Sequence, residues 1–190
     1  MDGRMLMIAF PGGNYGADSP LLYYARIAFE SRGYETAAIQ YTGQKKKAES
    51  LQAFILDNQQ NVKEQLHALN LTTFDNIVFV SKSLGTVFAG WAEDMLGIRV
   101  RHLFMTPLKE TLPYIHKGRE VAAVVAGTND PVLDAATLKI YCAKESVHLV
   151  QIGGADHRLE AAGDMEKNID ILRAVTEIYL ECADCPGEVK

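Results

Sequence analysis

Ser83 lies where a serine can become a nucleophile. The apolar run NIVFV leads into Ser81-Lys82-Ser83-Leu84-Gly85 and then directly into a segment with helical spacing. This context predicts a nucleophile elbow, a strained strand-to-helix turn that projects the serine hydroxyl from the carboxyl edge of a sheet. The residues two before and two after the serine must be small, a need that Gly85 meets fully and Ser81, in place of the usual glycine, meets in part. The alternative for Ser83 is a helix N-cap.

Asp130 and His157 could complete the chemistry that Ser83 needs. A serine nucleophile requires a base to take its proton and a carboxylate to orient that base and stabilise its charged form. Asp130 lies in the loop GTNDP after the run VAAVVA, and His157 lies in the loop GGADHR after VHLVQI. Loops that follow parallel strands meet at one edge of the sheet, where ligands bind. We therefore expect a catalytic triad. Turn or cap chemistry is the alternative for Asp130, and simple solvent exposure is the alternative for His157.

The other histidines suit the role of the base less well. His67 falls on an expected helix, and His102 and His148 fall inside expected strands. His116 lies in the connection after the fourth strand and is the second choice.

A glycine-rich loop follows the first apolar run, MLMIAF, at residues 11–16. Its glycines let backbone N–H groups approach a ligand closely. If this strand adjoins the elbow strand, the N–H groups of Gly13 and Leu84 could together form an oxyanion hole. The rival interpretation is a phosphate-binding loop, which the missing GxxxxGK[ST] lysine disfavours. The residues expected to contact a substrate are Gly12, Asn14, Tyr15, Lys82 and Met105.

The connection from Thr106 to Glu120 is too short for a helical cap, and it contains Pro107 and Pro113. We therefore expect an open site, which favours small or surface-presented acyl groups over long lipids. The candidates for the pocket wall, with core packing as the alternative for each, are Tyr15, Tyr23, Tyr24, Met105, Leu108 and Leu112.

Alternating apolar runs and helix-like segments position these loops. This βαβα alternation predicts an α/β fold, a three-layer α-β-α sandwich around a six-stranded, mainly parallel sheet, in a single domain spanning 1–190. The expected strands are 5–10, 35–41, 76–80, 100–105, 121–126 and 147–152. The expected helices are 20–32, 47–69, 86–96, 133–144 and 164–182. Ser19-Pro20 marks a helix start, and Gly33 and Gly97 mark helix ends.

The composition fits one soluble globular domain. The chain has 190 residues, of which 48% are hydrophobic and 23% charged, close to the globular average. A net charge of −5 offers no basic footprint for nucleic acid. The longest apolar run, Val121 to Ala126, is far shorter than the roughly 18 residues of a membrane-spanning helix, and MDGRMLMIAFPGG lacks the apolar region of a signal peptide. The expected location is cytoplasmic, without a membrane partner.

Three cysteines, including a lone CxxC at Cys182 and Cys185, are expected to be free thiols. The lysines at 45–47 are expected to form a solvated face. No cluster of ligands suggests a metal or cofactor.

Through FPGG, SKSLGT, GTNDP and GADH, the sequence resembles the α/β-hydrolase superfamily, in particular small bacterial members of the dienelactone-hydrolase-like kind. The resemblance implies that Ser83 is the nucleophile, His157 the general base and then acid, and Asp130 the orienting carboxylate. It also implies the strand order 2-1-3-4-5-6 without the N-terminal hairpin of larger members. Ser81 and Phe10-Pro11 depart from the family pattern. Dienelactone hydrolases use a cysteine nucleophile, so their substrate does not carry over.

The sequence thus favours a serine hydrolase that cleaves small carboxylic esters or thioesters through an acyl-enzyme and needs no cofactor. Two alternatives stay open: a peptidase or amidase with the same triad, and a non-catalytic binding domain on a hydrolase fold. The sequence leaves the oligomeric state open.

Overall fold

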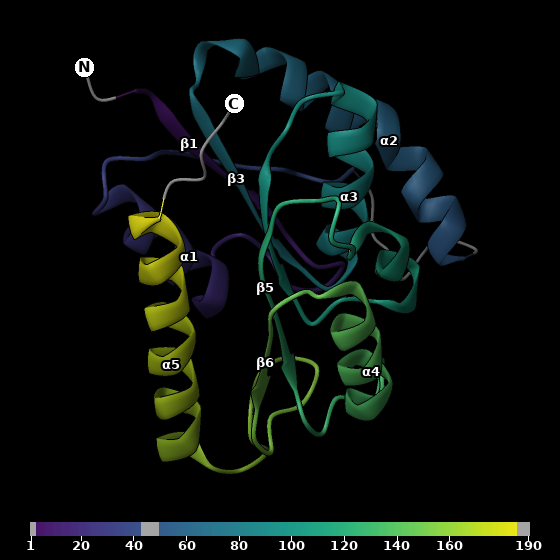
Figure 1. Ribbon diagram of the computed structural model, residues 1–190, viewed down its shortest axis with the longest axis vertical. Helices are drawn as coiled ribbons and strands as arrows, with labels where there is room; N and C mark the ends of the chain where they lie inside the picture. Colours follow the sequence, from purple (N-terminus) through teal and green to yellow (C-terminus); the bar gives the residue numbers. More distant parts are fainter. Residues whose placement is uncertain (1–2, 43–49, 186–190) are drawn as a thin grey trace.

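Six strands form one sheet in the order β2-β1-β3-β4-β5-β6 (Figure 1). The computed structural model describes residues 3–42 and 50–185. Every neighbouring pair of strands is parallel. The predicted strands and their order are confirmed. The strands are β1 (Met5–Phe10), β2 (Glu35–Ala38), β3 (Asn76–Lys82), β4 (Arg101–Met105), β5 (Val121–Gly127) and β6 (Leu149–Ile152).

Helices cover both faces of the sheet, as the predicted three-layer fold requires. They are α1 (Pro20–Glu30), α2 (Leu51–Ala68), α3 (Leu84–Leu96), α4 (Ala135–Glu145) and α5 (Met165–Asp184), with 3-10 turns η2 (Leu71–Thr73) and η3 (Lys109–Tyr114). Figure 1 shows α1 and α5 on one face and α2, α3 and α4 on the other. The three lysines at 45–47, and the predicted start of α2 at residue 47, lie outside the described residues.

Local signals account for where several helices begin and end. The hydroxyl of Ser50 accepts a hydrogen bond from Ala53 N, and the carboxylate of Asp134 accepts one from Thr137 N. Both cap N–H groups that a helix cannot satisfy internally. Gly97 ends α3 in the left-handed region with a φ of 62°, as predicted.

The sheet divides the interior into two apolar layers, because successive side chains of a strand point to opposite faces. All seven residues of β3 are buried. Ile77 and Phe79 pack in the layer beneath α2, α3 and α4. Val78 and Val80 pack in the layer beneath α1 and α5. A strand buried on both sides reads as a continuous apolar run, which is why β3 is recognisable in the sequence.

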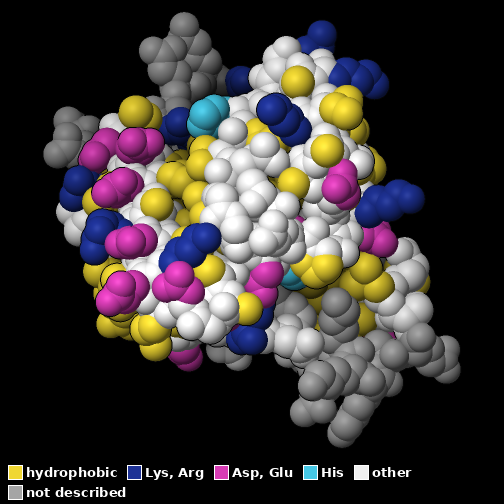
Figure 2. Space-filling view, turned by 90° about the horizontal axis from the view of Figure 1, so that it is seen from below, with side chains coloured by type: hydrophobic (Ala, Val, Ile, Leu, Met, Phe, Trp, Pro, Cys, Tyr) yellow, Lys and Arg dark blue, Asp and Glu magenta, His cyan; other side chains and the backbone are white. Residues whose placement is uncertain are grey.

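Between β4 and β5, residues 106–120 carry only the short turn η3, so no helical cap covers the carboxyl edge of the sheet there. On the face drawn in Figure 2, acidic and basic side chains are intermixed with hydrophobic ones. Among the described residues, none of the helices is both long and apolar enough to cross a membrane.

Candidate active site

Ser83 occupies the turn between β3 and α3 in a strained conformation. Its φ is 52° and its ψ is −118°, a region that a residue with a side chain rarely adopts. The hydroxyl makes no capping bond to α3. It lies 2.8 Å from Nε2 of His157 instead. Ser83 therefore occupies the N-cap position of α3 without capping the helix through its hydroxyl, and the turn has the geometry of a nucleophile elbow.

The two small residues of the elbow are explained by what lies against them. A Cβ atom at Gly85 would come within 2.0 Å of the carbonyl oxygen of Phe10, at the end of β1. Only glycine fits this approach of α3 to β1. Ser81 is fully buried, and its hydroxyl donates a hydrogen bond of 3.3 Å to the carbonyl of Leu103. A serine is tolerated there because its polar group has a partner.

Asp130 faces the other ring nitrogen of His157. Its Oδ2 lies 2.8 Å from Nδ1 of the histidine, and its Oδ1 accepts a hydrogen bond of 2.8 Å from Val132 N. The side chain is 1% exposed. Burial alone would raise the pKa of Asp130, but the hydrogen bonds from His157 and Val132 outweigh burial, so the pKa lies below its ordinary value. Asp130 thus does both the expected turn chemistry and the orienting of the imidazole.

Hydrogen bonds between two loops bring Asp130 to His157. Asn129 N donates to the carbonyl of Ala155 at 2.9 Å, and Gly154 N donates to the hydroxyl of Thr128 at 2.7 Å. A Cβ atom at Gly127 would lie 2.1 Å from the carbonyl oxygen of Ala155. The glycine that ends β5 therefore lets the histidine loop cross close to the strand.

The four other histidines lie elsewhere. His116, the second choice as a base, accepts a hydrogen bond from Gly118 N. His102 is fully buried and pairs with Glu93. His67 lies in the last turn of α2, and His148 precedes β6. The structure brings His157 to Ser83.

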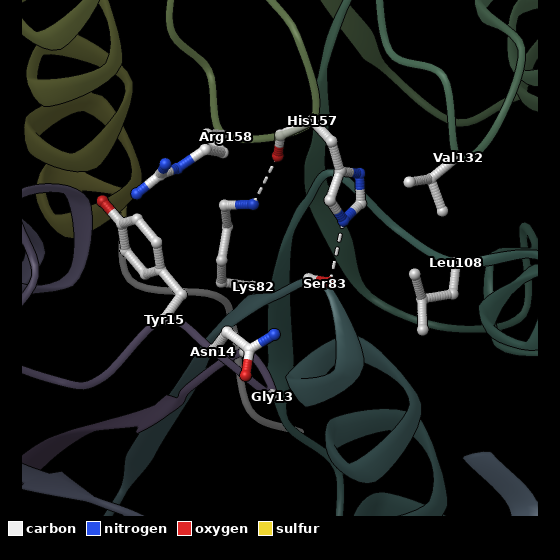
Figure 3. Close-up of a pocket in the computed structure, with 10 residues that line it drawn as sticks. Gly13, Asn14, Tyr15, Lys82, Ser83, Leu108, Val132, His157 and Arg158 are labelled. Carbon is white, nitrogen blue, oxygen red and sulfur yellow. Dashed lines mark hydrogen bonds between the residues drawn. The ribbon is translucent and has the colours of Figure 1, made fainter. Parts of the chain in front are cut away.

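A pocket of about 410 Å³ opens over Ser83 and His157 (Figure 3). Its other lining residues are Gly12, Gly13, Asn14, Tyr15, Lys82, Leu108, Val132 and Arg158. The first loop, the elbow and Leu108 therefore lie where the sequence placed them. Val132 and Arg158 were not predicted. Val132 follows Asp130 and Arg158 follows His157 closely on the same loops, and this proximity is the signal that could have identified them.

Four predicted wall residues do not line this pocket. Met105 is fully buried in the layer beneath α1 and α5, where its sulfur accepts a hydrogen bond from the hydroxyl of Tyr179. The alternation along β4 turns its side chain away from the site. Tyr23 and Tyr24 are exposed on α1, and Leu112 packs from η3 against the opposite layer. These four predictions are wrong.

Lys82 lines the pocket but does not offer a free amine to it. The side chain is buried, and Nζ donates to the hydroxyl of Thr106 at 2.5 Å and to the carbonyl of His157 at 2.7 Å. Lys82 thus lies in the pocket, as predicted, while the hydrogen-bond partners of its amine are both protein oxygens.

The predicted oxyanion donors lie at two different backbone features. Gly13 lies in a tight turn closed by hydrogen bonds between Gly12 and Tyr15. Leu84 is the first residue of α3, a position whose N–H has no acceptor within a helix. Both residues belong to segments that border Ser83.

A second hollow of about 410 Å³ adjoins the first and shares Tyr15 and Arg158 with it. Figure 3 shows these two side chains on the side of the pocket nearer α5. The remaining lining of this second hollow, which we call the α1–α5 groove, is Pro20, Leu21, Leu159, Glu160, Met165, Asn168, Ile169 and Leu172. The groove is lined mainly by apolar side chains and meets the pocket over Ser83 at Tyr15 and Arg158.

No protein-family model matches the sequence, and no curated protein matches it. Solved structures do match. A Xanthomonas campestris protein described as a candidate hydrolase of the alpha/beta superfamily superposes with a TM-score of 0.69 at 16% identity, covering 96% of this chain and 98% of that chain. Another X. campestris protein, a serine hydrolase without a lid, gives a TM-score of 0.64 at 16% identity, with coverages of 95% and 83%. Est1E from Butyrivibrio proteoclasticus, solved with ferulic acid bound, gives 0.67 at 14% identity, with coverages of 95% and 90%.

At sequence identities of 14 to 16%, the structural similarity establishes the fold and not the function. The chain has a minimal α/β-hydrolase fold, with a six-stranded parallel sheet and no lid between β4 and β5. Because one fold hosts many functions, the activity has to be argued from the site itself.

Proposed function

We propose that the protein is a serine hydrolase that cleaves small carboxylic esters or thioesters through an acyl-enzyme. The observation that carries the proposal is the hydrogen-bonded chain from Ser83 through His157 to Asp130, with both links at 2.8 Å, beneath an open pocket. A strained serine, a base within reach and a buried carboxylate behind that base are the parts that acyl transfer needs.

In the first half of the reaction, Oγ of Ser83 attacks the carbonyl carbon while its proton passes to Nε2 of His157. Asp130 holds the Nδ1–H tautomer and stabilises the imidazolium. The tetrahedral intermediate then collapses, the bond to the alcohol or thiol breaks, and Nε2 returns its proton to the leaving group. The acyl group is now an ester of Ser83.

In the second half, water replaces the alcohol or thiol. Nε2 of His157 takes a proton from the water, whose oxygen attacks the acyl carbon. When the second intermediate collapses, the proton returns to Oγ of Ser83 and the carboxylic acid leaves. Solvent reaches the pocket directly, because no cap covers it.

The negative oxygen of each intermediate needs donors at fixed positions. We assign this role to the N–H groups of Leu84 and Gly13. The N-terminus of α3 adds a favourable dipole at the same place. Removing one such donor typically costs a factor of about 10² to 10³ in rate.

The size of the pocket supports a small substrate. A volume of about 410 Å³ lies toward the lower end of the range for small-molecule sites, roughly 300 to 1,000 Å³. The named esterase-like neighbour, Est1E with ferulic acid bound, favours an ester over an amide by analogy of fold.

The first test compares two serines of the same turn. Ser83→Ala should abolish turnover of p-nitrophenyl acetate and labelling by a fluorophosphonate, because the nucleophile is gone. Ser81→Ala is the matched control, since its hydroxyl bonds only a backbone carbonyl, and it should keep both activities. Turnover by Ser83→Ala at the wild-type rate, or a wild-type protein that the fluorophosphonate does not label, would exclude the proposal.

A further inference from the structure

Lys82 is a lysine in an unusual position. It is the last residue of β3, immediately before Ser83, and only 1% of it is exposed. Burying an ammonium group is unfavourable unless the group has partners. Here two oxygen acceptors receive its protons, the hydroxyl of Thr106 and the main-chain carbonyl of His157. Nζ also lies 5.4 Å from the centre of the Tyr15 ring.

The charges around Lys82 come from two loops, the one after β5 and the one after β6. Asp130, on the loop after β5, and Asp156 and Glu160, beside His157, attract the ammonium, whereas Arg158 repels it. Burial is the stronger influence and lowers the pKa of Lys82 to about 8. A buried ammonium group next to Ser83 lowers the stability of the protein, so its presence there suggests a role in the site.

Lys82 and Ser83 hold His157 from two sides. Ser83 Oγ meets Nε2 of the ring at 2.8 Å, and Lys82 Nζ donates to the carbonyl of the same residue at 2.7 Å (Figure 3). Consecutive residues at the end of one strand thus fix both the side chain and the backbone of the base. Lys82 and Ser83 therefore supply two of the contacts that fix the imidazole relative to Oγ, beside the hydrogen bond between Nδ1 and Asp130.

The loop that carries His157 is held partly by its own contacts and partly by the loop after β5, through the bonds that join Asn129 N to the carbonyl of Ala155 and Gly154 N to the hydroxyl of Thr128. Asp156 Oδ1 accepts hydrogen bonds from Arg158 N and Glu160 N, and Leu159 has a positive φ of 60°. These contacts set the shape of the turn but not its distance from Ser83. The bond from Lys82 Nζ ties the backbone of the turn to the strand that carries the nucleophile.

We propose that Lys82 is a positioning residue that holds the backbone of His157 so that its ring faces Ser83, a role that rests on the proposed hydrolase function. Thr106 supports the amine from the end of β4. Its φ of 42° brings a β-branched residue into the left-handed region, a strain that tends to occur at functional sites. Lys82 does not react with the substrate.

The test begins with Lys82→Met, which keeps the length of the side chain and removes the donor. We expect kcat for p-nitrophenyl acetate to fall by about 10²-fold with KM nearly unchanged, because displacing a catalytic group by about 1 Å has that effect. The rate of fluorophosphonate labelling at Ser83 should fall in parallel. A residue that only bound substrate would raise KM instead.

Chemical rescue separates positioning from packing. Lys82→Ala leaves a space that opens into the pocket, since Lys82 lines it. Added ethylammonium should restore at least part of the labelling rate in Lys82→Ala. Ethanol, which has the same size but no positive charge, should not. The double variant Lys82→Ala/Ser83→Ala corrects for labelling at sites other than Ser83.

Thr106→Val distinguishes the two bonds of the amine. It removes the acceptor on β4 and leaves the bond to His157, so it should lower kcat much less than Lys82→Met. Equal losses in the two variants, or unchanged labelling in Lys82→Met, would overturn the proposal. A wild-type protein that fails to label at Ser83 would instead overturn the proposed function, so the two failures are distinguishable.

Discussion

At the scale of the residue, the burial of Lys82 makes the stability of the protein depend on pH. Its pKa in the folded protein is about 8, against an ordinary value of 10.5. Between these values the unfolded chain binds more protons than the folded one, so the free energy of unfolding rises with pH. Relative to Lys82→Met, the wild-type protein should gain about 3 kcal/mol from pH 8 to pH 10.5. Below pH 8 this contribution is absent.

Urea denaturation of both proteins across this pH range measures the effect. The difference between the two curves is needed, because other groups titrate there as well. Burial raises the pKa of Cys142 and of Cys182 to about 11, which lowers the stability of both proteins as the pH rises from 9 to 11. Parallel curves for the wild type and Lys82→Met would show that the ammonium is not buried in solution.

The residues that could be predicted from the sequence were those fixed by the chain itself. Ser83, Asp130 and His157 each follow an apolar run within a few positions, so the strand that precedes each residue determines its edge of the sheet. Met105 and Tyr23 could not be assigned in this way. Whether a side chain in a strand or helix faces a pocket depends on its neighbours in space, and those come from remote parts of the sequence.

At the scale of the element, the contact between α3 and β1 depends on a missing side chain. Gly85→Ala would place a methyl group 2.0 Å from the carbonyl oxygen of Phe10. Because this neighbour is backbone, helix and strand must separate. We expect a loss of about 1 to 3 kcal/mol in the free energy of unfolding, measured by urea denaturation, together with slower labelling of Ser83.

The matched control is Gly16→Ala, in the loop between β1 and α1. An added Cβ there has no neighbour within 4 Å, so the stability should stay near the wild-type value. If Gly85→Ala were as stable as Gly16→Ala, the close approach of α3 to β1 would be wrong.

The elements themselves were largely predictable from apolar runs and helix signals, with errors at their ends. β2 was expected to reach Tyr41 but ends at Ala38, although Ile39 N still bonds the carbonyl of Ala9. Beyond Ala38 the chain leaves the edge of the sheet, which an apolar pattern does not record. The strand order was predicted from the family resemblance, because local sequence patterns do not determine which parallel strands pair with each other.

At the scale of the whole molecule, the α1–α5 groove adjoins the pocket over Ser83 and offers an apolar wall beyond it. Ile169 is 53% exposed in the groove, where the acyl chain of a longer ester would lie. Ile169→Arg should lower kcat/KM for p-nitrophenyl octanoate by about 10-fold, through lost apolar contact, and leave that for the acetate unchanged.

Ile140→Arg is the control for this prediction. Ile140 is 72% exposed on α4, on the opposite face of the sheet from α5, and its replacement should affect neither ester. A chain-length preference that is the same in Ile169→Arg and Ile140→Arg would exclude the groove as an acyl site.

The wide spacing of the triad along the chain also bears on the stage of folding at which Ser83 can become reactive. Ser83 and His157 are 74 positions apart, and they meet through β5 and β6, the last two strands to be made. Contacts between remote segments form late, after the loop between them has closed. A chain with β1, β3 and β4 already paired would carry the elbow but no base, and it would be inert toward esters. Because His157 follows β6, we expect Ser83 to become reactive only once β6 has joined the sheet, and the rate at which a fluorophosphonate labels a refolding sample would test this.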